Sequence, residues 1–210
     1  MHRRFGIECR VGYLWTVKIL FIHGLASSGA YKMATMLRQL IRPVPEVIAP
    51  DFPVDPSEMA AMLERTCTDM EPDLTVGLSL GGFWAQKLKG RRKVLVNPSF
   101  HISGLLETMV GEVEYLSPRR DGATAFTITE DMVLRYKELE NNQFQGISPQ
   151  EAALTLGLFA DRDERVRCGA EFALSYPGRA VSYHGGHLPT YPEMKFQIVP
   201  EIERFLQETL

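Results

Sequence analysis

The sequence feature that most constrains the fold is a Gly-x-Ser-x-Gly motif, Gly77-Leu78-Ser79-Leu80-Gly81, between two contrasting segments. The apolar run 74–78 has the length and composition of a buried strand, whereas residues 83–89 favour a helix. A serine at a tight turn from strand to helix needs glycine two residues before and two residues after it, because neighbouring backbone passes close by. The motif therefore predicts a nucleophile elbow with Ser79 at its apex.

Strands and helices are predicted to alternate along the chain. Apart from the strand before Ser79, segments typical of strands occupy residues 17–22, 46–49, 93–96, 154–160 and 179–183. Helical patterns occupy residues 29–41, a segment after a Ser57 cap, and residues 83–89, 166–176 and 193–208. This alternation predicts an α/β fold, with about six mainly parallel strands flanked by helices.

Residues 101–150 interrupt the alternation, because a crossover between two parallel strands needs far fewer residues. One amphipathic helix is predicted from the apolar face formed by Leu105, Leu106, Met109, Val110 and Val113. A second helix is predicted after a Thr127-x-x-Glu130 capping box, with an apolar face formed by Met132, Val133, Tyr136 and Leu139. We expect a helical, lid-like insertion, or helices that only cover the sheet.

Residues 17–210 are expected to form a single domain, because a chain of 210 residues that is 45% hydrophobic can bury one substantial core. Residues 1–16 show no clear period and are interpreted as an N-terminal extension. Glu8, Arg10 and Lys18 interrupt the apolar core that a signal peptide requires, so export is not expected. No apolar run has the length of a membrane span. We therefore expect a cytoplasmic protein.

Charge and cysteine content limit the expected partners and cofactors. The net charge is −3 and no basic run is long, so nucleic acid is not an expected partner. Cys9, Cys67 and Cys168 are odd in number and lack Cys-x-x-Cys spacing, which indicates reduced thiols and neither a disulfide framework nor a metal site. No signal for an oligomeric state is present. The expected partner is a small-molecule acyl ester or thioester.

A serine nucleophile needs a base and an acidic group that orients the base. After an elbow of this kind the acid comes first along the chain and the histidine second, each at the end of a later strand. Asp161 and Asp163 both follow the strand predicted at 154–160. We prefer Asp163, because it lies in the turn and Val166 then resumes an apolar pattern. Asp161 is the alternative.

Two histidines compete for the role of base, since His184 and His187 both follow the strand predicted at 179–183. His187 comes after Gly185-Gly186, and these glycines allow the loop to carry the imidazole back over Ser79. His184 is nearly part of the strand. We therefore predict a catalytic triad of Ser79, His187 and Asp163.

An oxyanion hole is the remaining part of such a site. One donor should be the backbone N–H of Leu80, which follows the nucleophile, and the other should come from the loop after the first strand. That loop begins His23-Gly24-Leu25, so the second predicted donor is the Leu25 N–H. His23 is interpreted as an orienting or packing residue.

Taken together, these motifs resemble the YqiA/YcfP-like group of small bacterial α/β-hydrolases over about residues 17–208. The residues that carry the resemblance are Phe21-Ile22-His23-Gly24, Gly77 to Ala85, Val96-Asn97-Pro98, Phe126-Thr127-Ile128-Thr129, Asp163-Glu164 and Gly185-Gly186-His187. The resemblance implies an α/β-hydrolase core and a cytoplasmic hydrolase of carboxylic esters or acyl thioesters with short to medium acyl groups. Some relatives lack the elbow serine, which this chain retains. Relatives begin near the position of Val17, so the N-terminal extension is a departure.

The predicted function is that of a serine esterase acting through a Ser-His-Asp triad and an acyl-enzyme, with no cofactor or metal. An alternative is an acyl-CoA thioesterase, whose nucleotide would need a basic rim. Candidates for that rim are Lys32, Arg38, Arg119 and Arg120. Another alternative is a non-catalytic binding protein that keeps the hydrolase fold. The presence of all three triad residue types favours catalysis.

Overall fold

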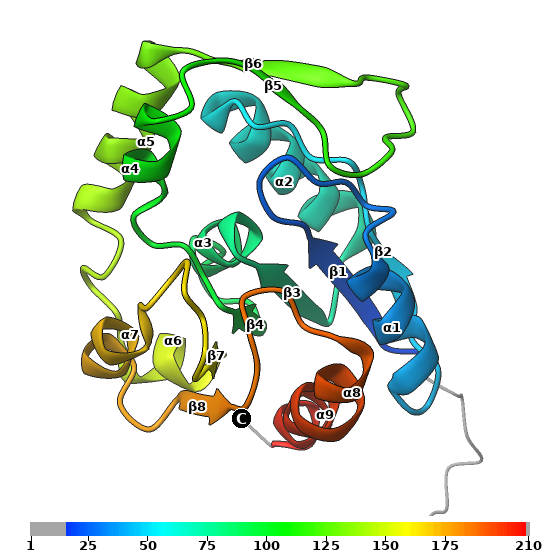
Figure 1. Ribbon diagram of the computed structural model, residues 1–210. Helices are drawn as coiled ribbons and strands as arrows, with labels where there is room; N and C mark the ends of the chain where they lie inside the picture. The colour runs from blue at the N-terminus through cyan, green and yellow to red at the C-terminus, as the bar shows by residue number, and fades with distance from the viewer. Residues whose placement is uncertain (1–15, 209–210) are drawn as a thin grey trace, which may run out of the picture.

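The computed structural model describes residues 16–208, which fold around a six-stranded sheet (Figure 1). In spatial order the strands are β2 (Glu46–Ile48), β1 (Lys18–Ile22), β3 (Leu74–Leu78), β4 (Lys93–Val96), β7 (Thr155–Ala160) and β8 (Ala180–Tyr183), and all neighbours are parallel. The strand order reverses at β1, so the carboxyl ends of β1 and β3 form the switch point at which such sheets bind ligands. The predicted α/β fold is confirmed.

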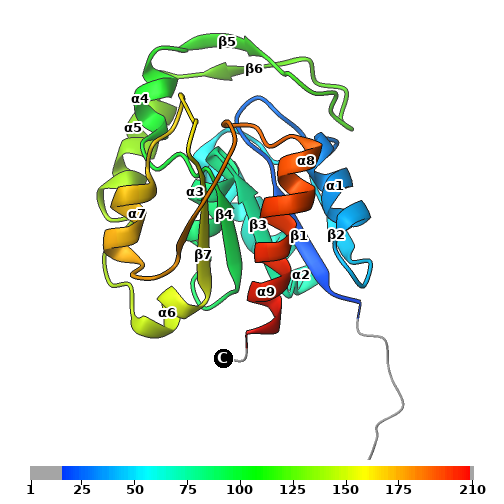
Figure 2. The ribbon, with the colours of Figure 1, turned by 60° about the horizontal axis from the view of Figure 1, so that its bottom comes forward.

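Helices cover both faces of the sheet, so successive side chains of β1, which point to opposite faces, are all buried from Ile19 to Ile22. Ile19 and Phe21 share a buried cluster with α1 (Lys32–Leu40) and with the C-terminal helical segment formed by α8 (Tyr191–Glu193), the π-helical turn η1 (Met194–Ile198) and α9 (Val199–Gln207). Leu20 and Ile22 share a second cluster with α2 (Pro56–Met70), α3 (Leu80–Gln86) and α7 (Gly169–Ser175). In Figure 2, α9 lies in front of the sheet and α3 lies behind it.

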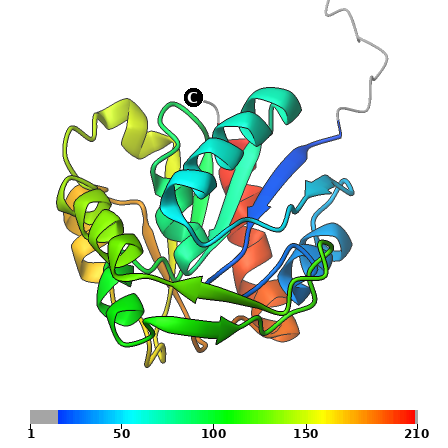
Figure 3. The ribbon, with the colours of Figure 1, turned by 90° about the horizontal axis from the view of Figure 1, so that it is seen from above.

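Residues 101–150 connect β4 to β7. They contain α4 (Ile102–Glu107), β5 (Gly111–Glu114), β6 (Ala125–Ile128), α5 (Glu130–Asn141) and the start of α6 (Pro149–Ala153), and the hairpin of β5 and β6 lies over the carboxyl ends of the strands (Figure 2). The β5–β6 hairpin is antiparallel and extends across this end of the molecule (Figures 2 and 3). The Leu116 N–H donates to the Ala26 carbonyl at 2.7 Å, and the Arg119 guanidinium donates to the Phe52 carbonyl at 3.2 Å. The hairpin is therefore tied to the loops that follow β1 and β2, and its movement as a lid stays a prediction.

The prediction of a purely helical insertion is wrong at its first helix. The helix α4 ends at Glu107, and Gly111 has a φ of 125°, a backbone conformation that ends a right-handed helix. Val113, predicted on the helical face, instead pairs with Phe126 in the hairpin. In β5 and β6 alternate side chains turn toward the core, and a strand repeat this short is hard to separate from a helical one.

Two predicted helix caps are also wrong, each by two residues. Asp55 caps α2 in place of Ser57, because its carboxylate accepts hydrogen bonds from the Ser57 and Glu58 N–H groups and Pro56 fills the first helical position. Thr129 caps α5 in place of Thr127, which lies in β6. The other predicted elements are present, with ends that differ by a turn or less.

The N-terminal extension predicted at residues 1–16 lies outside the described residues, apart from Thr16. Within residues 16–208, every helix is too short or too polar to cross a lipid bilayer.

Candidate active site

Ser79 lies at the turn from β3 to α3, with φ 56° and ψ −117°, a conformation that L-residues rarely adopt. A Cβ atom on Gly77 would lie 2.2 Å from the Gly81 carbonyl oxygen, and one on Gly81 would lie 2.0 Å from the Ile22 carbonyl oxygen. Backbone atoms would have to move to relieve contacts as short as these. Both glycines are therefore required sterically, and the predicted strand-to-helix turn is observed.

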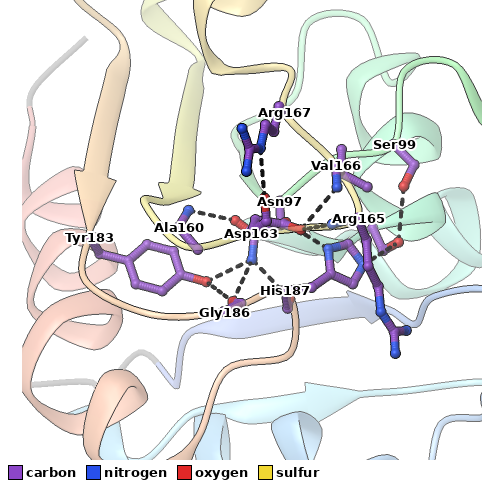
Figure 4. A network of polar contacts seen from close by, with 11 residues as sticks. Asn97, Ser99, Ala160, Asp163, Arg165, Val166, Arg167, Tyr183, Gly186 and His187 are labelled. Carbon is purple, nitrogen blue, oxygen red and sulfur yellow. Dashed lines mark hydrogen bonds and ion pairs between the residues drawn. The ribbon is translucent and has the colours of Figure 1, made fainter.

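Three side chains from separate loops form a continuous hydrogen-bonded chain (Figure 4). His187 Nε2 lies 3.0 Å from Ser79 Oγ, and His187 Nδ1 lies 2.7 Å from Asp163 Oδ2. Asp163 is only 2% exposed, and its other oxygen accepts hydrogen bonds from the Arg165 and Val166 N–H groups at 2.8 and 2.9 Å. A carboxylate held in this way favours the imidazole with its proton on Nδ1, which leaves Nε2 free to accept the Ser79 proton.

The two rejected candidates, Asp161 and His184, pair with each other at the surface. His184 Nδ1 lies 2.8 Å from Asp161 Oδ2, and the side chains are 65% and 44% exposed. The hydrogen bond from His184 lowers the pKa of the Asp161 carboxyl. The structure thus brings Asp163 and His187 to Ser79 and directs the alternative pair to solvent.

The predicted oxyanion donors lie on the two loops nearest Ser79. A Cβ atom on Gly24 would lie 3.4 Å from the Ser79 Cβ, so the loop after β1 passes directly beside the serine. Leu25 lines the same cavity as Ser79, and Leu80 is the first residue of α3. Among the described residues, neither the Leu25 nor the Leu80 N–H donates to another protein group. Both N–H groups therefore stay candidates for the oxyanion hole, and that of Leu80 lies at the N-terminus of α3.

His23 is buried behind this loop and has both ring nitrogens occupied. Its Nδ1–H donates to the Gly24 carbonyl at 2.9 Å, and its Nε2 accepts from the Phe52 N–H at 2.9 Å. Burial is the main reason why its pKa falls from 6.5 to about 4, with a smaller lowering by Arg119 opposed by Asp51. His23 is therefore a neutral residue that joins the loops after β1 and β2.

We expect His23 to make the protein less stable in mild acid. Between pH 6.5 and 4 the unfolded chain binds a proton at this position that the folded chain does not. The contribution of neutral His23 to the free energy of unfolding is thus complete above pH 6.5. It falls on acidification by up to about 1.4 kcal/mol per pH unit. Urea unfolding at a series of pH values should show that the free energy of unfolding depends less steeply on pH in His23→Gln than in the wild type. His184→Gln, at an exposed site, is the matched control, and equal slopes for wild type and His23→Gln would contradict the assignment.

Asn97 holds the histidine loop in place, a role that the sequence analysis did not assign. It follows β4 with a φ of 44°, and its amide group donates to the Tyr183 hydroxyl and to the Gly186 and His187 carbonyls at 2.7, 3.2 and 2.8 Å. Its side-chain oxygen accepts from the Ala160 N–H at 2.8 Å (Figure 4). One buried side chain therefore fixes the ends of β4, β7 and β8 relative to one another.

Ser99 is a second site residue that the sequence analysis missed. Its Oγ lies 3.0 Å from Ser79 Oγ, and its N–H donates to the Ser79 carbonyl at 3.1 Å. Asn97 and Ser99 follow a predicted strand, as the other candidates do. Their place at the carboxyl end of a parallel strand is the sequence signal that indicates both.

Ser79 opens into a cavity of about 790 Å³. Its wall includes aliphatic side chains from four regions of the chain: Leu78, Ile102, Leu105, Met109, Leu116, Val166 and Leu188. The insertion supplies four of these, so it forms part of the cavity wall as well as a cover. An apolar cavity of this size can accommodate an acyl chain.

The basic rim predicted from Lys32, Arg38, Arg119 and Arg120 is not at this cavity. None of the four is among the described residues that line it. Arg38 donates to the Val47 carbonyl, and Arg119 donates to carbonyl groups in the loop after β2. The arginines that do line the cavity are Arg165 and Arg167, in the loop that begins at Asp163. Neither was among the residues predicted for the rim.

A group of possible metal ligands lies beside the cavity. The ligand atoms of His101, Cys168 and Glu171 are all within 4.8 Å of one another. His101 Nε2 and Glu171 Oε2 already form a hydrogen bond of 2.8 Å, and burial raises the pKa of the Cys168 thiol. His101 and Glu171 are therefore paired with each other, and Cys168 lies buried beside them.

Solved structures with similar folds include several hydrolases. A monoacylglycerol lipase from Paleococcus ferrophilus has 13% identity and a TM-score of 0.64, with 91% of this chain and 95% of that chain covered. An esterase domain from Rhodothermus marinus has 16% identity and a TM-score of 0.60, covering 90% and 88%. The type II thioesterase BorB of the borrelidin biosynthetic cluster has 14% identity and a TM-score of 0.54, covering 95% and 94%. At these identities the likeness establishes the α/β-hydrolase fold.

Comparison with curated proteins finds no match. The model of one protein family, described as "Uncharacterised protein family (UPF0227)", matches residues 18–164. The match includes the elbow, the loop after β1 and Asp163, and it agrees with the resemblance to YqiA/YcfP-like proteins. The chain therefore belongs to the UPF0227 family of α/β-hydrolase-fold proteins.

Proposed function

We propose that the protein is a serine hydrolase that cleaves carboxylic esters of short to medium acyl groups. The observation that carries the proposal is the chain of hydrogen bonds from Asp163 through His187 to Ser79, at the wall of an apolar cavity. Each side chain comes from the carboxyl end of a different strand, where enzymes with such sheets place their reacting groups. A rigid sheet therefore supports the whole arrangement.

The proposed reaction begins when Ser79 Oγ attacks the acyl carbonyl while His187 Nε2 accepts the hydroxyl proton. Asp163 keeps the imidazole oriented and stabilises its charged form. The N–H groups of Leu25 and Leu80 bind the oxyanion, and His187 returns the proton to the leaving alcohol. Water activated by His187 then attacks the acyl-enzyme and releases the acid. Ser99 lies within hydrogen-bond distance of the attacking oxygen, so it holds Ser79 Oγ in place before attack.

Labelling with a fluorophosphonate probe tests this proposal. We expect the folded protein to be labelled at Ser79, as found by peptide mapping, because an adjacent base activates only this serine. Heat-denatured protein and the Ser79→Ala variant should remain unlabelled, and a variant at another buried serine, Ser103→Ala, should label normally, because Ser103 does not line the cavity. Folded wild-type protein that failed to react would contradict the proposal and favour the non-catalytic binding protein.

A further inference from the structure

Three side chains of the kinds that bind transition metals meet at the wall of the cavity beside Ser79. The ligand atoms of His101, Cys168 and Glu171 all lie within 4.8 Å of one another. Two of these residues, His101 and Cys168, line the cavity. Within residues 16–208, no other group of three His, Cys, Asp or Glu residues is placed to hold a metal ion. The cavity therefore has a candidate metal centre separate from the candidate triad.

The core of the protein holds the two segments that carry these ligands. His101 is the N-cap residue of α4, whereas Cys168 is the N-cap residue of α7 and Glu171 lies in the first turn of α7. Residues three apart on a helix are neighbours on its surface, so Cys168 and Glu171 share a face. Phe100 and Phe172, which follow each other in the core, are both fully buried, and their rings stack with centroids 6.3 Å apart. Each is the chain neighbour of a ligand, so core packing fixes the ligands relative to one another.

The spacing of the ligand atoms suits a tetrahedral ion after small side-chain movements. Zinc bonds of about 2.0–2.3 Å place the ligand atoms of such a site roughly 3.3–3.8 Å apart. His101 Nε2 and Glu171 Oε2 are 2.8 Å apart, so an ion would separate them by roughly half an ångström. Their side chains are 63% and 36% exposed, and pairing between such groups adds little stability. The pair can therefore open toward an ion, with the buried Cys168 as third ligand.

We propose that His101, Cys168 and Glu171 form a zinc-binding site that opens into the cavity. Imidazole, thiolate and carboxylate are the ligands of zinc sites, whereas Mg²⁺ and Ca²⁺ prefer oxygen ligands alone. Zinc binds the thiolate, so binding releases the thiol proton to solvent. Three protein ligands leave a fourth position for water, on the cavity side. Cysteine spacing alone predicts no metal here, because only one of the three ligands is a cysteine.

A zinc ion at this wall is expected to inhibit ester hydrolysis. His101 comes two residues after Ser99, whose hydroxyl lies 3.0 Å from Ser79 Oγ. The ion and its bound water would add charge and hydration beside Ile102, in a cavity where an apolar acyl chain is expected to bind. The KM for a neutral ester should therefore rise when zinc is bound. This consequence rests on the proposed function, whereas zinc binding itself does not.

Cobalt substitution tests the site directly, because Co²⁺ binds the same kinds of ligand as Zn²⁺ and its absorption reports them. Folded wild-type protein, first treated with a chelator, should bind one Co²⁺ per chain with a thiolate-to-cobalt charge-transfer band and the intense d–d bands of a four-coordinate ion. Zinc should displace the cobalt. Cys168→Ser should abolish the charge-transfer band. His101→Gln and Glu171→Gln should each weaken zinc binding at least about tenfold, since even outer-shell partners of a metal contribute that much to affinity.

Two variants are matched controls for the ligands. Cys67 is also a buried cysteine and His184 is also an exposed histidine that pairs with a carboxylate, and neither belongs to the group. Cys67→Ser and His184→Gln should bind both metals as the wild type does, and Cys9→Ser controls for the third cysteine. Circular dichroism verifies that each variant is folded. A charge-transfer band that persists in Cys168→Ser, or folded wild-type protein that binds no cobalt, would refute the site.

Hydrolysis of p-nitrophenyl butyrate at increasing zinc concentration tests the inhibition, with each rate expressed relative to the same protein without zinc. Wild-type protein should show a higher KM that a chelator reverses, and Glu171→Gln should need at least about ten times more zinc for the same effect. Equal zinc sensitivity of the two proteins would show that zinc acts elsewhere, such as at His187, and would refute inhibition through this site. If no form hydrolyses the ester and no probe labels Ser79, the proposed function is refuted, and the cobalt titration still decides the zinc site.

Discussion

Replacing Asp163 with asparagine is expected to lower kcat for p-nitrophenyl butyrate by about 10⁴-fold while the protein stays folded. The backbone N–H groups of Arg165 and Val166 already point at Oδ1 of this residue, so they require an acceptor there. The amide oxygen of the asparagine would take that position and its NH₂ group would face His187 Nδ1. The imidazole would then carry its proton on Nε2, where it could no longer accept the proton of Ser79.

Asp161→Asn is the matched control for this experiment. The two residues differ by two positions, both contact a histidine, and only Asp163 is connected to Ser79. We expect Asp161→Asn to retain kcat within about twofold, since it perturbs a hydrogen bond between exposed groups. Steady-state kinetics of both variants, with urea unfolding to verify the fold, provides the comparison. A large loss of kcat in Asp161→Asn together with no loss in Asp163→Asn would show that Asp163 is not the acid of the triad.

The positions of the candidate triad could be predicted because parallel strands place their carboxyl ends at one edge. Once Ser79 was located by its glycines, the acid and the base had to follow later strands, which reduced each choice to two residues. Local chemistry then separated the alternatives: Gly185-Gly186 lets the loop bring His187 back to Ser79, whereas His184 extends from β8 into solvent. Short-range sequence and the order of the strands along the chain are therefore enough to predict these three positions.

Residues that act across the sheet could not be assigned from the sequence. Asn97 contacts the end of β7 and the loop after β8, more than 60 residues away in the chain, and Arg165 reaches the cavity beside Ser79 only through the path of its loop. Which asparagine or arginine serves such a role depends on the pairing of strands and the path of the loops. The residues next to Asn97 or Arg165 in the sequence do not indicate that role.

The hairpin in the insertion was missed for a different reason. The apolar residues of 105–113 fit a helical face, but α4 ends at Glu107 and Gly111, with a φ of 125°, begins β5. Each hairpin strand is only four residues long, so its alternating pattern is too short to outweigh the helical one. Cross-strand pairing, such as that of Val113 with Phe126, selects the strand instead.

Replacing Gly81 with alanine is expected to destabilise the protein by about 4 kcal/mol or more, which is at the upper end for single substitutions. The added Cβ would lie 2.0 Å from the Ile22 carbonyl oxygen and 2.7 Å from that of His23. These are backbone atoms at the carboxyl end of β1, next to β3, so relief requires α3 to move away from the sheet. Urea unfolding followed by circular dichroism measures the loss.

Gly104→Ala is the matched control, because Gly104 lies within α4 and a Cβ there would meet no atom within 4 Å. Alanine favours a helix over glycine by about 1 kcal/mol, so this variant should be as stable as the wild type or slightly more stable. In Gly81→Ala, any fraction that remains folded should also lose ester hydrolysis, because the displaced helix carries Ser79 and the Leu80 N–H away from Leu25. A Gly81→Ala variant with wild-type stability and wild-type kcat would show that the close packing of α3 against β1 is not what positions the nucleophile.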